Sequence, residues 1–218
     1  SLRVFPNKYP AFSAGKPIRQ LSEGPYFAMS GVGYHELFVT RDAERQIGLL
    51  EEWQVAELID AYQDRYLALM HQKSVNYIQI FQNHGKEAGA SIAHPHSQLM
   101  AIPVVSPYLA LELEGAERYF RSTRTKVYST IVEYECEDRK RVIFGNEHFV
   151  AFCPFASRAA FEVWIVGKRP SPYFEHITDE EKFTLAQALK QSLYSIHKGL
   201  NDPAYNFYIH TAPCDGRD

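Results

Sequence analysis

The chain has 218 residues, 45% of them hydrophobic and 14% aromatic, which is enough apolar material for one large packed domain or two small ones. A formal net charge of −3, with no dominant run of Lys or Arg, argues against a nucleic-acid partner. There is no apolar run of roughly 18 residues, the start SLRVFPNKYP has no signal-peptide pattern, and three widely spaced cysteines indicate reduced thiols, so we expect a cytoplasmic protein without a membrane partner.

Taken in chain order, the first half predicts strands around one long helix. Residues 2–12 favour a short strand that runs into a turn, residues 13–33 a Gly-, Pro- and Ser-rich loop, and residues 34–40 (YHELFVT) a strand. From residue 44 to about 72, apolar residues recur every three or four positions, which is typical of a helix with one buried face. Residues 77–83 (YIQIFQN) predict the next strand.

A connecting helix is expected next, and the second half then repeats this order. The expected elements are a helix at 106–127 that frays near Ser122, strands at 149–155 and 161–167, a helix from about 179 to 198 and a strand at 205–211. Thr178 is followed three residues later by Glu181, which is the pattern of a capping box at the start of a helix.

The two halves match in spacing as well as in order. Corresponding strands lie 42 residues apart in the first half, from His35 to Tyr77, and 44 residues apart in the second, from Phe161 to Tyr205. A chance likeness of strand–helix–strand order does not explain this near-equal spacing, so we interpret it as an internal repeat.

The repeat predicts an α+β fold of two tandem half-units, each with an antiparallel sheet and helices packed on it. We place the first half-unit at residues 1–127 and the second at residues 128–218. The second has no counterpart to the last strand of the first before the sequence stops at Asp218. We therefore expect the chain to be a fragment, or its ends not to be ordered.

The most chemically specific segment is NHGKEAGASIAHPHSQLMAIP, which begins at Asn83. In an extended chain, side chains two positions apart share a face, so His94, His96 and Gln98 point the same way while Ser97 turns to the other side. Two satisfied histidines on a strand are one interpretation of this row. A zinc ion held by both histidines, with further ligands from elsewhere, is another.

A phosphate beside a histidine is the interpretation that we favour. Gly85 and Gly89 let the backbone turn without steric cost, and Asn83, Ser91 and the loop amides offer hydrogen-bond donors to an anion. Most other histidines, His35 among them, are expected to be surface or satisfied groups.

These residues resemble a known family. NHGKEAGASIAHPHSQ resembles the active-site segment of the galactose-1-phosphate uridylyltransferases, a branch of the histidine triad (HIT) superfamily. RVFPNKYPAF resembles that family's nucleotide-binding opening strand, and YNFYIHTAP resembles a later strand that ends in a histidine. The resemblance implies two tandem HIT-like half-units, a homodimer and a role in carbohydrate metabolism.

The resemblance also implies a reaction and its residues. His96 would attack the α-phosphorus of a nucleotide sugar and carry the nucleotidyl group, with Gln98 as the second catalytic residue. UMP would thereby move between a UDP-hexose and a hexose 1-phosphate. The residues implied in substrate binding are Asn7, Asn83, Gly85 and Ser91.

Metal sites of the family are matched only in part. A structural zinc in the family uses a Cys pair, a histidine and the first histidine of the HPH motif, and here His94 alone matches. A second divalent metal uses residues that match Glu112 and His210, together with an HxH pair further on, which we expect to lie past Asp218. The resemblance thus implies zinc and a second metal ion in the intact protein.

Departures from the family pattern leave the nucleobase open. Ser97 replaces the family's glycine between the second histidine and the glutamine, and Lys8 replaces an aspartate that many members carry. One alternative is an ADP-sugar or dinucleotide phosphorylase that uses the same histidine. An alternative of another class is a non-catalytic nucleotide-binding HIT-like module.

Overall fold

The computed structural model describes residues 2–214, which form two compact units, each assembled from separate stretches of the chain. Over the described residues, unit 1 contains residues 2–43, 61–105 and 204–214, and unit 2 contains residues 44–60 and 106–203. The half-units predicted at residues 1–127 and 128–218 concern a sequence repeat, and they stay a prediction.

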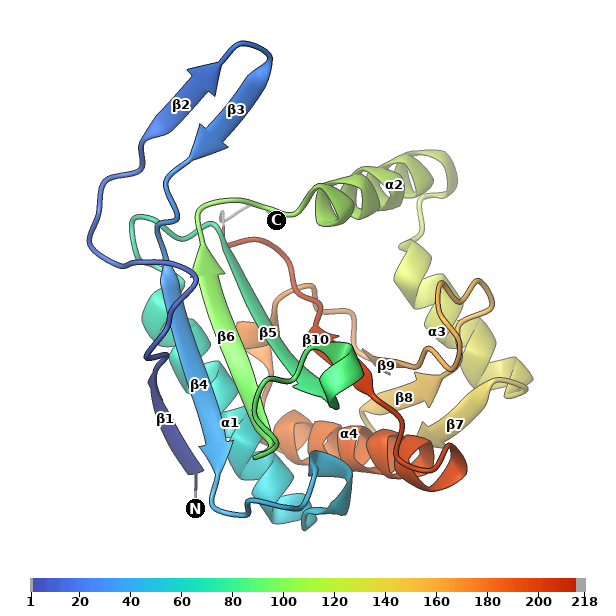
Figure 1. Ribbon diagram of the computed structural model, residues 1–218. Helices are drawn as coiled ribbons and strands as arrows, with labels where there is room; N and C mark the ends of the chain where they lie inside the picture. The colour runs from blue at the N-terminus through green and yellow to red at the C-terminus, as the bar shows by residue number, and fades with distance from the viewer. Residues whose placement is uncertain (1, 215–218) are drawn as a thin grey trace. The chain divides into compact units, whose positions relative to one another are not determined.

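Unit 1 is built on a five-stranded antiparallel sheet with the strand order β1-β4-β6-β5-β10 (Figure 1). The strands are β1 (Leu2–Pro6), β4 (Tyr34–Thr40), β5 (Tyr77–His84), β6 (His96–Ile102) and β10 (Tyr205–Ile209). Each contains a stretch that the sequence predicts as extended. The last strand in the sequence, β10, pairs with β5, which brings the C-terminal stretch beside the central strands.

The two faces of this sheet differ. Phe38 packs edge-on against Tyr62 of helix α1 (Glu52–Leu69) with ring centroids 4.8 Å apart, and both side chains are fully buried. On the opposite face, a row of side chains runs in register across four strands. The row consists of Leu37, Gln98, Phe81 and Tyr208. The first face is the core of unit 1, and the second lies open.

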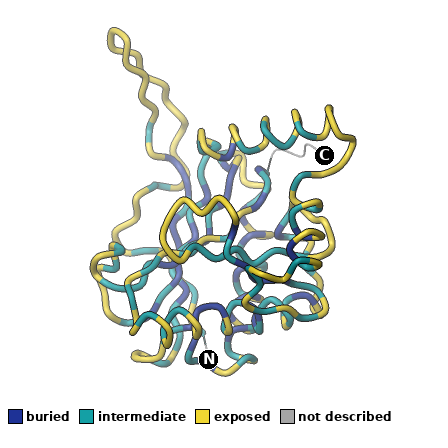
Figure 2. Tube along the Cα trace, turned by 90° about the vertical axis from the view of Figure 1, so that its right-hand side faces the viewer, coloured by how far each residue is buried: buried dark blue, intermediate teal, exposed yellow. Residues whose placement is uncertain are grey.

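A hairpin replaces the loop expected at residues 13–33, so that prediction is wrong there. Its strands are β2 (Gln20–Glu23) and β3 (Tyr26–Met29), joined at Gly24, whose φ of +57° suits a tight turn. Figures 1 and 2 show the hairpin extending from the sheet of unit 1 with its strands exposed. Because neither face is buried, the hydrophobic alternation that signals a strand is missing.

Unit 2 combines helices with a three-stranded antiparallel sheet of order β7-β8-β9. Its elements are α2 (Pro107–Thr123), α3 (Val127–Asp138), β7 (Val142–Gly145), β8 (Phe149–Phe152), β9 (Trp164–Gly167) and α4 (Asp179–Gly199). A cluster of Val132, Val150 and Phe152 forms a core between α3 and the sheet. The predicted capping box of α4 is present, with Thr178 and Glu181 bonded reciprocally.

The first predicted helix begins later in the structure, and the connecting helix ends close to the residue where fraying is expected. The first helix begins at Glu52 rather than at residue 44, because a 3₁₀ turn (Ile47–Leu49) precedes it. A Cβ at Gly48 would lie 2.7 Å from the backbone nitrogen of Tyr194, so α4 packs directly on this turn. The connecting helix ends at Thr123, in agreement with the fraying expected near Ser122, and α3 follows. None of the helices within residues 2–214 is long and apolar enough to span a membrane.

Candidate active site

Strand β6 presents His96 and Gln98 on the open face of the sheet. Burial alternates along this segment: His96 and Gln98 are half-buried, while Pro95 and Ser97 are buried. Ser97 pairs with Gln82 of β5, so the next residues of the two strands, His96 and Asn83, are neighbours on the open face. The structure therefore brings three of the predicted site residues together.

The ring of His96 is held by the backbone just before it. Its Nδ1 donates a hydrogen bond to the carbonyl oxygen of His94 at 2.9 Å. A carbonyl oxygen only accepts, so the proton of the neutral ring lies on Nδ1 and the lone pair on Nε2. This is the protonation pattern that a nucleophilic imidazole requires.

His94 lies before the first residue of β6 and is tied to strand β4. Its Nε2 donates to the carbonyl oxygen of Thr40 at 2.8 Å. The bond joins the chain entering β6 to the end of β4, and it fixes the residue whose carbonyl holds His96. His94 therefore acts here as a link between backbone segments.

Gln98 and Asn7 meet at one buried histidine. The Nε2 of His35 lies 2.9 Å from Gln98 Oε1, and Asn7 Nδ2 lies 3.3 Å and 3.5 Å from the two ring nitrogens. The Nδ1 of His35 also accepts a bond from the backbone N–H of Ala11 at 3.2 Å. His35 is thus a satisfied histidine, as expected, but its partners are residues of the site. The sequence contained a signal for these contacts. Residues two apart on a strand share a face, so His35 lies on the same face of β4 as Leu37, the residue that pairs with Gln98.

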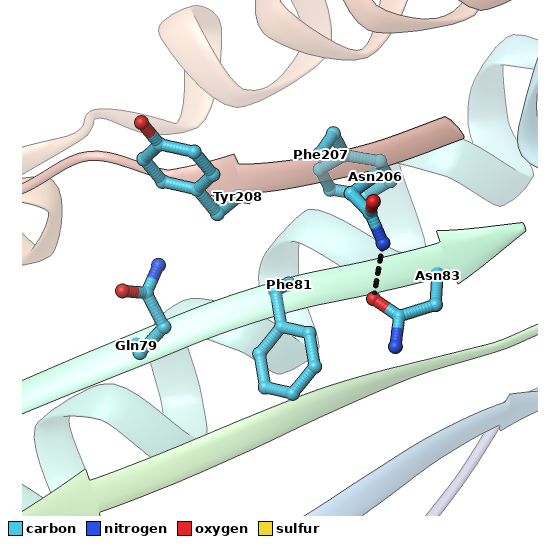
Figure 3. Close-up of a pocket in the computed structure, with 6 residues that line it drawn as sticks. All are labelled: Gln79, Phe81, Asn83, Asn206, Phe207 and Tyr208. Atoms are coloured by element: carbon cyan, nitrogen blue, oxygen red, sulfur yellow. Dashed lines mark hydrogen bonds between the residues drawn. The ribbon is translucent and has the colours of Figure 1, made fainter. Parts of the chain in front are cut away.

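Asn83 is bound to the last strand of unit 1 (Figure 3). Its Oδ1 accepts a hydrogen bond from Asn206 Nδ2 at 2.7 Å, and the same nitrogen donates to the carbonyl of Ala88 at 2.9 Å. Ala88 ends the short 3₁₀ turn (Lys86–Ala88) that follows Gly85. Asn206 therefore holds both Asn83, which is predicted to bind the phosphate, and the glycine loop that follows it.

The glycine loop depends on a close backbone contact. Gly85 has φ +83°, and a Cβ at this position would lie 2.8 Å from the Cβ of Ala204. Any other residue would be strained and would also push the loop from β10. Ser91 follows in an exposed bend.

A cavity of about 360 Å³ adjoins Asn83 on the open face, between β5 and β10. Figure 3 shows the six residues that line it: Gln79, Phe81, Asn83, Asn206, Phe207 and Tyr208. The volume falls in the range of small-ligand sites. Aromatic rings and amides together suit a ligand with a planar or sugar-like part and hydrogen-bonding groups.

Beneath the site, Ser97 joins a buried chain of polar groups. The Tyr62 hydroxyl donates to Ser97 Oγ, which donates to Gln82 Oε1 at 2.9 Å. Burial raises the pKa of the Tyr62 phenol above its ordinary value, so this group stays a donor. Ser97 faces the core of unit 1, away from His96, and it offers no direct contact to a ligand on the open face.

The predicted metal ligands do not form a site by themselves. Across residues 2–214, no three His, Cys, Asp or Glu side chains gather as metal ligands. The Nε2 of His94 is engaged by Thr40, Glu112 lies 3.7 Å from Arg158 within unit 2, and His210 follows β10 in unit 1. The residues present do not complete the zinc site, and the chemistry below uses no metal.

An antiparallel sheet with a His-Pro-His strand beside a glycine loop defines the HIT-like class of α+β proteins. Residues 50–201 match the family described as "Domain of unknown function (DUF4921)", and the chain belongs to that family. Its relatives confirm the predicted kinship with the galactose-1-phosphate uridylyltransferases.

Two curated relatives illustrate this kinship. An ADP-glucose phosphorylase of Arabidopsis thaliana is 36% identical over 215 residues, which cover 97% of this chain and 60% of that protein. A galactose-1-phosphate uridylyltransferase of Thermotoga maritima is 31% identical over 191 residues, covering 87% of this chain and 59% of that protein. The chain thus spans about 60% of the length of these relatives.

Solved structures agree with the predicted fold class. An ADP-glucose phosphorylase from Arabidopsis thaliana with bound ADP-glucose superposes with a TM-score of 0.86 at 34% identity, covering 100% of this chain and 67% of that one. A uridylyltransferase structure superposes with a TM-score of 0.89 at 29% identity, covering 97% and 68%. The α+β fold with antiparallel sheets is therefore confirmed.

Proposed function

We propose that this chain carries the nucleotidyl-transfer site of an enzyme that acts on nucleotide sugars, with His96 as the nucleophile. The observation that carries the proposal is the bond from His96 Nδ1 to the His94 carbonyl, which leaves Nε2 unprotonated on the open face. The names of the relatives support the substrate class: a nucleotide sugar and a sugar 1-phosphate.

In the first step, the lone pair on His96 Nε2 attacks the α-phosphorus of the nucleotide sugar. A phosphorus–nitrogen bond forms, the bond from phosphorus to the bridging oxygen breaks, and the electron pair leaves on the sugar 1-phosphate. Donors from Gln98, Asn83 and Ser91 stabilise the charge on the pentavalent phosphorus. Asn7 and Gly85 complete the predicted binding site by shaping the segments beside it.

In the second step, an oxygen of a phosphate acceptor attacks the same phosphorus. The phosphorus–nitrogen bond breaks, and its electron pair returns to His96 Nε2. The acceptor leaves carrying the nucleotidyl group, so one site serves both half-reactions in ping-pong order.

An ADP-sugar as donor and inorganic phosphate as acceptor is the form of this reaction that we put first. The 36% identity to an ADP-glucose phosphorylase, over 97% of this chain, favours it. Transfer of UMP between a UDP-hexose and a hexose 1-phosphate is the second candidate, favoured by the Thermotoga maritima relative at 31% identity.

A substrate comparison separates these forms. The full-length protein is supplied with ADP-glucose and phosphate, or with UDP-glucose and galactose 1-phosphate, and release of glucose 1-phosphate is followed. We expect faster release in the first mixture. Faster release in the second favours uridylyl transfer, and release in neither, with nucleotide binding still measurable by calorimetry, favours a non-catalytic binding module.

The resemblance also predicts features that the described residues do not display. Zinc, a second divalent metal and a homodimer stay predictions for the full-length protein, as does a cytoplasmic location. Metal analysis of the purified protein and its mass in solution test the first three. Metal content below one zinc per chain and a monomeric mass would contradict them.

A further inference from the structure

Two amide side chains of the site are locked in one orientation by residues that the proposed chemistry does not use. We propose that His35 and Asn206 are positioning residues: they hold the carbonyl oxygens of Gln98 and Asn83, and so turn both NH₂ groups toward the substrate phosphate. The inference rests on the proposed function for its substrate. The orientation itself follows from hydrogen bonds within unit 1.

The orientation of Gln98 is set by a backbone N–H. Ala11 N–H can only donate, so His35 Nδ1, 3.2 Å away, must accept. The proton of the neutral His35 ring then lies on Nε2, which faces Gln98 at 2.9 Å. Only an oxygen of the Gln98 amide satisfies that N–H, and the amide nitrogen is therefore the atom turned away from His35. His35 is 8% exposed, so water does not replace this partner readily.

The orientation of Asn83 is set by a backbone carbonyl. Ala88 C=O can only accept, so the atom of Asn206 that lies 2.9 Å from it must be the NH₂ nitrogen. The same nitrogen lies 2.7 Å from Asn83, which must present its oxygen there. Asn83 Nδ2 consequently lies beside the glycine loop, 3.7 Å from the position of a Cβ at Gly89.

Each series of hydrogen bonds begins at a backbone group with a fixed role, the Ala11 N–H or the Ala88 carbonyl. Each ends at an amide, Gln98 or Asn83, whose NH₂ group is turned toward the place of the anion. The reverse orientation of either amide would present a carbonyl oxygen to a negatively charged phosphate, which is repulsive. Fixing the amides before the substrate arrives removes the need to reorient them as charge develops on the phosphorus.

Two variants, His35→Gln with an amide side chain and His35→Leu with an apolar one, test whether His35 orients Gln98. A glutamine at position 35 can accept from Ala11 and donate to Gln98, whereas leucine does neither. We expect kcat for ADP-glucose phosphorolysis to fall at least about 10-fold in His35→Leu with little change in KM, and the glutamine variant to recover most of this loss. Equal loss in both variants, or no loss in either, would overturn a positioning role.

Asn206→Asp tests the second lock. An aspartate at this position is nearly isosteric but cannot donate to Asn83 or to Ala88, so Asn83 turns its NH₂ toward residue 206. We expect a fall in kcat of about 10-fold or more. Since the added charge could act by itself, Asn206→Leu, which is neutral and also lacks the donor, should show a similar fall. An unchanged kcat in Asn206→Leu would count against this lock.

A measurement that needs no activity separates this inference from the proposed function. Neutron diffraction from deuterium-exchanged crystals of the ligand-free protein locates the amide deuterons of Gln98 and Asn83 directly. We expect them on the atoms facing away from His35 and Asn206. Deuterons facing His35 or Asn206 would refute the orientation whatever the enzyme does, while absent turnover with the expected deuterons would refute only the proposed function.

Discussion

Ser97 sits between the proposed nucleophile and Gln98, yet its side chain faces the opposite side of the strand. Its hydroxyl accepts from Tyr62 and donates to Gln82, and all three side chains are at most 1% exposed. Burying a hydroxyl costs little free energy when both of its hydrogen bonds are made. Without the Ser97 hydroxyl, Tyr62 and Gln82 would each lose a hydrogen bond at a position that water cannot reach. Ser97 thus connects β6 to α1 and β5 by hydrogen bonds, and it does so between the two proposed catalytic residues, His96 and Gln98.

Replacing this serine should therefore lower stability before it alters substrate choice. We predict that Ser97→Ala lowers the free energy of unfolding by about 1 to 3 kcal/mol, because Tyr62 and Gln82 lose a partner. Urea unfolding measures the change, with Ser22→Ala in the exposed hairpin as a control that should stay within about 0.5 kcal/mol. A loss in Ser97→Ala no larger than the control would show that the buried chain does not stabilise the sheet.

For single residues, the sequence predicts which face of a strand a side chain lies on better than it predicts the hydrogen-bond partner of that side chain. Period-two alternation places His96 and Gln98 on one side of a strand and Ser97 on the other, and the structure has this arrangement. It cannot name the partner of Gln98, because His35 is 63 residues away in the chain and becomes a neighbour only through β4–β6 pairing.

At the scale of elements, the loop between β5 and β6 is shaped by one glycine contact. Gly85 and Gly24 both have positive φ, +83° and +57°, but the ψ of Gly85 is 149°, a combination open essentially only to glycine, so an alanine at Gly85 carries the larger backbone strain. They differ in surroundings: a Cβ at Gly85 meets Ala204 at 2.8 Å, while a Cβ at Gly24 meets nothing within 4 Å.

Gly24→Ala is the control for a positive φ in open space, whereas Gly85→Ala adds both a larger backbone strain and the contact with Ala204. We predict that Gly24→Ala costs about 1 kcal/mol of stability and leaves turnover near the wild-type value. Gly85→Ala should cost more and should lower kcat at least about 10-fold, because the loop must move away from β10 and carry Asn83 with it. The test is urea unfolding together with turnover of each variant; equal effects of the two variants would show that neither the backbone conformation of Gly85 nor its contact with Ala204 shapes the site.

The start of α4 carries a charge pair that should make stability depend on pH. Hydrogen bonds from the Arg169 guanidinium at 2.7 Å lower the pKa of Glu181 to about 2, from an ordinary value of 4.5. Because the folded-state pKa is depressed, the contribution to stability is complete above about pH 4.5 and is lost as the pH falls toward 2.

Glu181→Gln keeps a side chain that suits the capping box and removes the charge. At pH 7 we predict a loss of about 1 to 2 kcal/mol, since the half-exposed Arg169 is partly screened by solvent. Near pH 2.5 the gap between variant and wild type should have mostly closed. Urea unfolding at both pH values is the measurement, with the exposed Glu180→Gln as control, and a gap that does not shrink would contradict the assigned charge pair.

Elements differed in how well the sequence predicted them, for physical reasons. The capping box of α4 and the half-buried strands of unit 1 have local signals, and they appear where expected. The hairpin formed by β2 and β3 has no buried face, so its glycine and proline suggested a loop. The prediction that the first helix begins at residue 44 is wrong because Gly48 packs against α4, and local periodicity holds no information about that contact.

For the whole molecule, the repeat in the sequence and the compact units of the structure describe different things. Strand β10 comes from the second half of the sequence but completes the sheet of unit 1, where Asn206 holds Asn83. The second half of the chain therefore contributes directly to the site that the first half carries.

The central claim is a covalent nucleotidyl intermediate on His96, and intact-protein mass spectrometry tests it most directly. The full-length protein is mixed with ADP-glucose, or with UDP-glucose, without an acceptor. We predict a mass increase of one nucleotidyl group, acid-labile and base-stable as expected of a phosphorus–nitrogen bond, and its loss when phosphate is added. His96→Ala should show no increase. An adduct on His96→Ala, or none on the wild type with either donor, would contradict the claim.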